Sequence, residues 1–267
     1  MTAQDRASEL CDDLAAEQSE LAGIVAGLAD DGWSRATPAD GWEVRDQISH
    51  LAFFDEAARV AVSDPDRFAA ERPSDLEELE ALVASATEKG RKMSGEDVLA
   101  WWDAERVALV AELRRTPPGS RVPWYGPSMS IASFATARLM ETWAHGQDVV
   151  DALGARRTPT DRLRHIAHLG VLTRENSFRV RSLECPSEPV LVELRSPSGA
   201  VWTWGDTAAN EAVRGTALDF CLVVTQRRHV ADTDLEVHGD GARRWMSLAQ
   251  AFAGSAGRGR RIGQFRS

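Results

Sequence analysis

A long helix is predicted over Ser130-Ile-Ala-Ser-Phe-Ala-Thr-Ala-Arg-Leu-Met-Glu-Thr-Trp-Ala-His-Gly-Gln-Asp-Val-Val-Asp-Ala-Leu-Gly154. Ser128 or Ser130 can cap its start, Gly154 suits a left-handed residue at its end, and no proline interrupts it. Spacings of three and four residues place four ionisable side chains on one face of this helix: Arg138, Glu141, His145 and Asp148. Burying such groups without partners is costly, so they must meet one another, a group on another helix, or a metal ion.

Two of these residues are candidate metal ligands. Glu141 and His145 lie one turn apart, and the only other histidine among the first 155 residues is His50. Two imidazoles and one carboxylate suffice to hold a catalytic zinc and leave a coordination position for water or substrate. By spacing alone, a Glu-x-x-x-His pair is more often an ordinary surface pair. The apolar setting of the pair, and the place of His50 near the inward side of another predicted helix, favour the metal site.

Three further helices are predicted before the long one. Apolar residues recur at helical spacing in the segments 3–28, 42–60 and 94–115. With the long helix they predict an antiparallel four-helix bundle over 1–155, the first domain. The charged stretch 62–93 contains a shorter predicted helix at 75–88, which is interpreted as an insertion or a lid over the bundle.

The second half of the chain predicts a small α+β domain over 156–253. Two apolar segments flank Ser196-Pro-Ser-Gly199, a pattern typical of a β-hairpin. The expected elements are a helix over 160–174, strands over 189–195 and 200–204, a helix over 216–228, a strand over 235–238 and a helix over 242–252. The glycine- and arginine-rich tail 254–267 is predicted to be disordered.

Composition restricts the class of protein. The chain has 267 residues, of which 43% are hydrophobic, and a formal net charge of −10, which argues against nucleic acid as a partner. No stretch approaches the roughly 18 apolar residues of a membrane span, and the start lacks a signal-peptide pattern, so a soluble cytoplasmic protein without a membrane partner is expected. The three cysteines, Cys11, Cys185 and Cys221, are far apart and predict buried, inert thiols.

Two motifs carry a family resemblance: Trp42-Glu-Val-Arg-Asp-Gln-Ile-Ser-His-Leu-Ala52 and Glu141-Thr-Trp-Ala-His-Gly-Gln-Asp-Val-Val-Asp-Ala-Leu-Gly154. Together they resemble the metal-binding signature of the mycothiol-dependent maleylpyruvate isomerase family, a branch of the DinB-like bundle proteins. The resemblance covers most of 1–155. It implies a DinB-like bundle in which His50, Glu141 and His145 bind a divalent metal, usually zinc.

A looser resemblance extends to the second half. The segments Val213-Arg-Gly-Thr-Ala-Leu-Asp-Phe220 and Gly239-Asp240 are similar to the sterol-carrier-like C-terminal domains of that family. A domain labelled for tRNA wyosine formation is also associated with such sequences, but the net acidity and the lack of a cysteine cluster argue against that label as a guide. The stretch 64–91 and Trp124-Tyr-Gly-Pro127 depart from the isomerase pattern and indicate a sibling subfamily, so the substrate cannot be carried over.

These observations lead to the hypothesis of a metal-dependent enzyme, with zinc or another divalent ion, acting on a small thiol such as mycothiol or on its conjugate. The reaction would be an isomerase, transferase or hydrolase step at a thiol or water activated on the metal. Asp148 is a candidate acceptor that orients a ligand imidazole, or else a salt-bridge partner of Arg138 or of an arginine in the second domain. Arg227 or Arg228 could reach an anionic substrate, although a role as plain surface charge is the more common one.

Two aromatic residues are candidates for the wall of a pocket. Trp124 and Tyr125, in the turn-rich loop 116–127, could line the pocket for a cofactor or simply pack.

A non-catalytic protein that holds a metal or a small apolar ligand is the main alternative function. An Fe(II) oxygenase is a further one, because it uses a similar ligand set. In a purely structural protein, His50 would lie too far from Glu141 and His145 to share an ion. A homodimer is a further expectation.

Overall fold

The computed structural model describes residues 3–265. The chain divides into two compact units between Arg157 and Thr158. The sequence places this boundary two residues earlier, after residue 155. The predicted fold class, a helical bundle followed by a small α+β domain, is confirmed.

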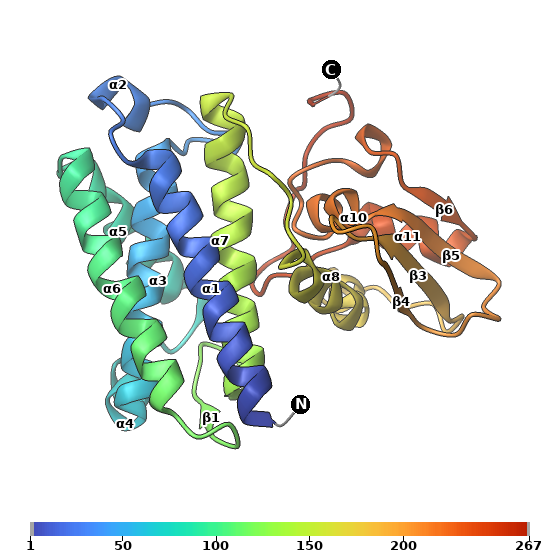
Figure 1. The fold of residues 1–267 in the computed structure, drawn as a ribbon, viewed down its shortest axis with the longest axis horizontal. Helices are drawn as coiled ribbons and strands as arrows, with labels where there is room; N and C mark the ends of the chain where they lie inside the picture. Colours follow the sequence, from blue (N-terminus) through green and yellow to red (C-terminus); the bar gives the residue numbers. More distant parts are fainter. Residues whose placement is uncertain (1–2, 266–267) are drawn as a thin grey trace. The chain divides into compact units, whose positions relative to one another are not determined.

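The first unit is a four-helix bundle (Figure 1). Its long helices are α1 (Ala3–Val25), α3 (Val44–Ser63), α6 (Gly95–Arg115) and α7 (Ile131–Leu153). Each packs against two of the others, because α1 and α3 both contact α6 and α7. Leu21, Ile48, Leu51 and Trp102 are among the fully buried side chains of its core.

Local capping chemistry sets the ends of these helices. The Ser130 side chain accepts a hydrogen bond from Ser133 N at the start of α7, and Gly154 ends that helix in the left-handed conformation with φ 63°. Both ends of the long predicted helix are therefore confirmed. At the start of α3, Glu43 and Asp46 form a reciprocal capping box.

Smaller elements connect the long helices. They are α2 (Asp30–Trp33), α4 (Pro65–Glu71), α5 (Leu76–Arg91) and the two-stranded ribbon of β1 (Arg121–Val122) and β2 (Met129–Ser130). The stretch 62–93 is interpreted from the sequence as an insertion or a lid outside the core, and the second half of α5 departs from this. There Ala86, Thr87 and Gly90 are buried, and α5 packs against α3. The small side chains allow this approach, since the site of a Cβ on Gly90 is taken by Ser49.

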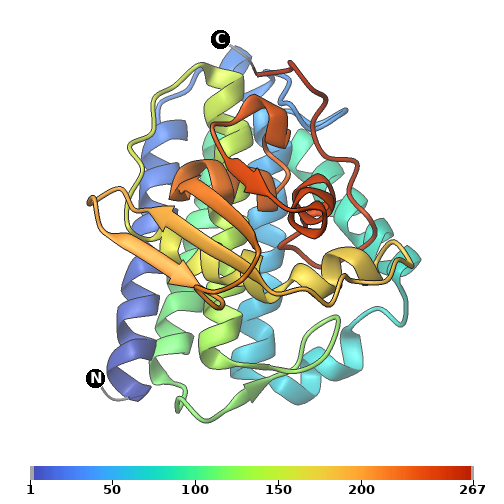
Figure 2. The same ribbon diagram turned by 90° about the vertical axis from the view of Figure 1, so that its right-hand side faces the viewer.

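The second unit contains a four-stranded mixed sheet with the order β4-β3-β5-β6 (Figure 2, orange). Its strands are β3 (Val190–Arg195), β4 (Val201–Trp204), β5 (Glu211–Thr216) and β6 (Glu236–His238). β3 and β4 form the predicted hairpin, whereas β3 and β5 are parallel. The remaining elements are α8 (Leu163–Leu172), α9 (Arg174–Arg179), α10 (Ala217–Val224), the 3-10 turn η1 (Val230–Asp232) and α11 (Asp240–Leu248).

The tail was predicted to be disordered, and the structure instead places its described part, 254–265, along the second unit. Gly257 N donates to Gln250 Oε1 at 3.0 Å, and Arg181 Nη2 donates to Gly257 O at 3.0 Å. Gly263 N donates to the Asp232 carboxylate at 2.8 Å. Backbone groups of the glycine-rich segment thus find side-chain partners that composition does not reveal.

Two further expectations can be compared with the structure. Within 3–265, no helix is long and apolar enough to cross a membrane. Cys11 and Cys221 are free and buried, and burial raises the pKa of each thiol, as expected for inert residues. Cys185 is only half-buried.

Candidate metal centre

Three ligand groups converge between α3 and α7. His50, Glu141 and His145 each offer one ligand atom, and these atoms all lie within 4.8 Å of one another. The centroids of the two imidazole rings are 4.2 Å apart, and His145 Nε2 lies 3.2 Å from Glu141 Oε2. All three residues are half-buried, so a small ligand can reach the group.

The packing of two neighbouring helices explains this convergence. α3 carries His50, α7 carries Glu141 and His145, and the two helices contact each other in the bundle. On α7 the four-residue spacing sets the carboxylate beside the imidazole of the next turn. The structure thus brings together the three residues that the sequence selects. In a purely structural protein, His50 was expected to lie too far from Glu141 and His145 to share an ion.

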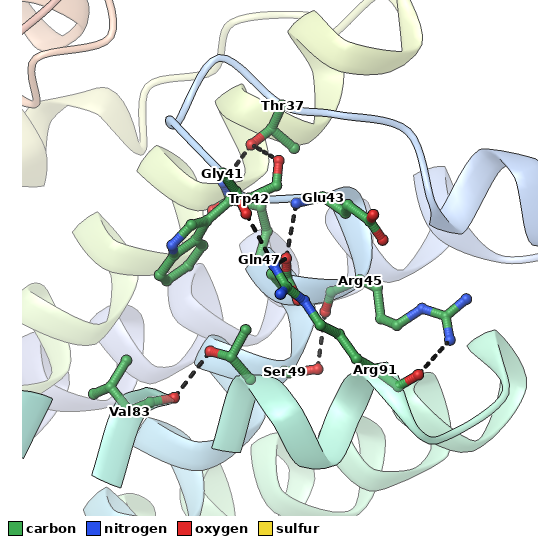
Figure 3. Close-up of polar contacts among 11 residues, drawn as sticks. Thr37, Gly41, Trp42, Glu43, Arg45, Gln47, Ser49, Val83 and Arg91 are labelled. Atoms are coloured by element: carbon green, nitrogen blue, oxygen red, sulfur yellow. Dashed lines mark hydrogen bonds and ion pairs between the residues drawn. The ribbon is translucent and has the colours of Figure 1, made fainter. Parts of the chain in front are cut away.

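A buried glutamine contacts one of the two imidazoles. Gln47 Oε1 lies 2.5 Å from His145 Nδ1, and Gln47 Nε2 donates to Thr37 Oγ1 at 2.9 Å. Thr37 Oγ1 in turn donates to the backbone oxygen of Trp42 at 2.9 Å (Figure 3). Gln47 is fully buried and lies one turn before His50 on the same face of α3.

The sequence predicts that Asp148 either accepts a hydrogen bond from a ligand imidazole or pairs with an arginine. Asp148 is buried on α7, but the contact at His145 Nδ1 comes from Gln47. The available signal was the spacing of Gln47 and His50, three residues apart on a helix that faces α7. This spacing alone does not distinguish an amide that contacts a ligand from one that is simply buried.

Aromatic rings extend from the site along one side. The Phe54 ring centroid lies 4.6 Å from that of His50, 6.2 Å from Trp124 and 5.9 Å from Tyr125. Trp124 and Tyr125 are both half-buried, and the Phe54 ring connects them to His50 of the ligand group. Desolvation raises the pKa of Tyr125 to about 12, although the nearby Arg138 acts in the opposite direction. The phenol is therefore a neutral hydrogen-bond donor at physiological pH.

A buried ion pair lies one turn from the ligands. Arg138 Nε donates to Asp55 Oδ1 at 2.9 Å, and the two side chains are 4% and 0% exposed. Asp55 Oδ2 also accepts from Trp102 Nε1 at 2.9 Å and Gln18 Nε2 at 3.1 Å. Desolvation raises the pKa of Asp55, while Arg138 and these hydrogen bonds lower it. Arg138 thus pairs across to α3 and is not the salt-bridge partner of Asp148.

The two arginines selected for substrate binding lie in the second unit, after α10. Arg227 Nη1 donates to Thr225 O at 2.6 Å, and the Arg228 guanidinium lies 3.8 Å from the ring centroid of Phe265. Their action on an anionic substrate stays a prediction.

Comparison with known families assigns the chain. Residues 14–150 match the model of the mycothiol maleylpyruvate isomerase N-terminal domain, and residues 186–237 match a model described as wyosine base formation. The first match covers most of the bundle and just over half of the chain. The protein belongs to the mycothiol maleylpyruvate isomerase N-terminal domain family.

Two mycobacterial proteins are similar to this chain over most of its length. Two proteins of Mycobacterium tuberculosis, from strains CDC 1551 / Oshkosh and ATCC 25618 / H37Rv, are each 48% identical to this chain over 248 residues. The match covers 93% of this chain and 96% of theirs, and both are described as uncharacterized.

Solved structures of a mycothiol-dependent maleylpyruvate isomerase and of its histidine-to-alanine variant share the fold. Each has a TM-score of 0.60 and 15% identity, covering 85% of this chain and 93% of the other.

Proposed function

We propose that this protein binds a divalent metal, zinc being the expected ion, through His50, Glu141 and His145. We propose further that it catalyses a thiol-dependent isomerase, transferase or hydrolase reaction. The observation that carries the proposal is the convergence of three ligand atoms within 4.8 Å. Family membership supports a thiol of the mycothiol type, with a small thiol conjugate or anionic molecule as substrate.

The donor set fits zinc. Two imidazole nitrogens and one carboxylate oxygen are a ligand set of catalytic zinc sites, where the fourth position stays open. The carboxylate and the imidazole nitrogen that face each other at 3.2 Å on α7 suit a shared cation. A bound zinc ion supplies a Lewis acid that lowers the pKa of a thiol or water.

The surrounding residues of the chain have separate roles in this proposal. Phe54 and Trp42 flank the imidazoles, with ring centroids 4.6 Å from His50 and 6.0 Å from His145, and limit access of water. Tyr125 keeps its proton and can donate it in a hydrogen bond to a substrate oxygen. Asp148, Arg227 and Arg228 remain candidates for contacts with a ligand imidazole or a substrate anion.

Metal content tests the first part of the proposal. Protein purified without a histidine tag is analysed by plasma mass spectrometry beside the variants His145→Ala and His165→Ala. His165 lies on α8 in the second unit and serves as the matched control. We expect about one zinc per chain in the wild type and the control, as in one catalytic site, and loss of zinc in His145→Ala. Equal zinc in all three proteins would contradict the proposed ligands.

Binding without turnover is the second candidate function, and the aromatic side of the site favours it. Phe54, Trp124 and Tyr125 could hold an apolar ligand beside the metal. Zinc-loaded protein is therefore assayed with thiol conjugates and with apolar ligands. Consumption of a thiol conjugate that requires His145 supports the enzyme. A ligand that raises the melting temperature while no conjugate is consumed favours the binding protein.

A further inference from the structure

We infer that Gln47 is a positioning residue of the metal centre and that Thr37 sets the orientation of its amide. The inference rests on the proposed function, because it concerns a proposed zinc ligand. Its structural part, the position of a proton on His145, can be measured without any metal.

The direction of each hydrogen bond follows from the backbone outward (Figure 3). The carbonyl oxygen of Trp42 can only accept, so the Thr37 hydroxyl donates its single hydrogen to it at 2.9 Å. Thr37 Oγ1 is then left with lone pairs only. The group of Gln47 that lies 2.9 Å from this oxygen must therefore be the amide nitrogen. The hydrogen bonds thus determine which way the amide is turned.

The same reasoning fixes the proton on the imidazole. With its nitrogen toward Thr37, Gln47 presents Oε1 to His145, and an amide oxygen can only accept. Nδ1 of His145, 2.5 Å away, therefore carries a hydrogen. Nε2 lies 3.2 Å from the Glu141 carboxylate, which also can only accept, so Nδ1 carries a hydrogen whether or not Nε2 does. A metal ion shared with Glu141 would need the lone pair of Nε2, and Gln47 would keep the hydrogen on Nδ1.

Burial makes this arrangement strong. Gln47 is 0% exposed, so no water competes for its amide, and the low local dielectric strengthens both hydrogen bonds. Thr37 is fixed beside the Gln47 amide because backbone contacts close the loop before α3. Thr37 N donates to Trp42 O at 2.7 Å, and Ala36 pairs with Glu43. The loop and α3 thereby orient a side chain of α7.

Zinc affinity, measured by competition with a chromogenic chelator, tests the functional consequence. Gln47→Leu removes the acceptor at similar volume, and we expect zinc binding to weaken about 10–100-fold, the usual effect of losing such a partner. Gln47→Glu keeps an acceptor for Nδ1 and should restore binding. Gln147→Leu is the matched control, because Gln147 lies two residues from His145 but donates to Asp151. Its affinity should equal that of the wild type.

Nitrogen NMR of the imidazoles in metal-free protein tests the Nδ1 hydrogen itself. We expect an Nδ1 hydrogen that exchanges slowly with water in the wild type and rapidly in Gln47→Leu. A wild type without a hydrogen on Nδ1, or unchanged zinc affinity in Gln47→Leu, would overturn the inference. If Gln47→Leu does not fold, Thr37→Val, which leaves Gln47 in place, should show the same loss in a smaller degree. Wild-type protein that binds no zinc refutes the proposed function, while the spectrum still decides the role of Gln47.

Discussion

Tyr125 is the single tyrosine of the chain, so its ionisation can be followed alone by ultraviolet absorbance. Desolvation among the aromatic rings beside the site raises its pKa to about 12. We therefore expect a midpoint near that value in the folded protein and near the ordinary value of 10 in urea. Because the folded pKa is the higher one, this group's contribution to stability is complete below pH 10 and declines as the pH rises toward 12. Equal midpoints in both states would show that Tyr125 is solvated.

The Arg138–Asp55 pair predicts a large effect of removing one partner. Arg138→Met leaves the Asp55 carboxylate buried without its cation, and breaking a buried pair in this way typically costs about 3–5 kcal/mol. The double variant Arg138→Met with Asp55→Asn should lose less than the two single variants together. Urea unfolding of the four proteins measures these free energies. Additive losses would mean that the two residues act independently.

For single residues, the sequence predicts the candidate metal ligands better than it predicts the hydrogen-bond partners of buried side chains. The four-residue spacing of Glu141 and His145, with one other histidine in the bundle, was sufficient to select the three ligand groups. The partners Gln47 and Asp55 lie 98 and 83 residues from His145 and Arg138, and only the packing of α3 against α7 brings them there. A helix pattern indicates that Arg138 needs a partner, but not which residue supplies it.

Among the secondary-structure elements, the contact of α5 with α3 depends on Gly90. A Cβ added there would lie 2.8 Å from the Cβ of Ser49, so the helices would have to separate. We expect Gly90→Ala to lower the free energy of unfolding by about 1–3 kcal/mol, as overpacking does. Gly23→Ala on α1 is the control, because nothing lies within 4 Å of its added Cβ, and it should stabilise by up to about 1 kcal/mol. Thermal unfolding of both variants decides; a stabilising Gly90→Ala would show that α5 is only loosely packed.

The predictability of the elements follows their local signals. α7 has a serine cap, an apolar body and a terminal glycine, so its ends were predicted correctly. No strand is predicted at β5, because Glu211–Thr216 has only a short apolar pair and no alternation. Its partner β3 is separated from it in the chain by β4. A parallel strand pairing of this kind depends on tertiary contacts that no short segment encodes.

For the whole molecule, the boundary between the units is marked by Arg157. Its side chain is 7% exposed and pairs with the buried Glu17 of α1, and its Nη1 donates to Trp143 O at 3.0 Å. The sequence places the boundary before this residue because linker composition starts at Ala155. The long-range contact with α1 explains why the first unit extends to residue 157.

A protein of residues 1–157 should therefore unfold in one cooperative transition. Within it, Arg157→Met leaves Glu17 buried without its cation and should lower the free energy of unfolding by about 3–5 kcal/mol. The exposed neighbour Arg156 provides the control, and Arg156→Met should change stability by less than about 0.5 kcal/mol. Circular dichroism in urea measures both. Equal effects of the two variants would place the boundary before Arg157.

The central claim, that one metal ion is shared by two helices of the bundle, is tested most directly by anomalous diffraction at the zinc absorption edge from crystals of the tag-free protein. We predict a single strong peak with bonds of about 2.0–2.2 Å to an imidazole nitrogen of His50, to Nε2 of His145 and to a carboxylate oxygen of Glu141. A zinc-supplemented crystal with no peak among these three residues, or with its peak at the histidines of α8, would contradict the account.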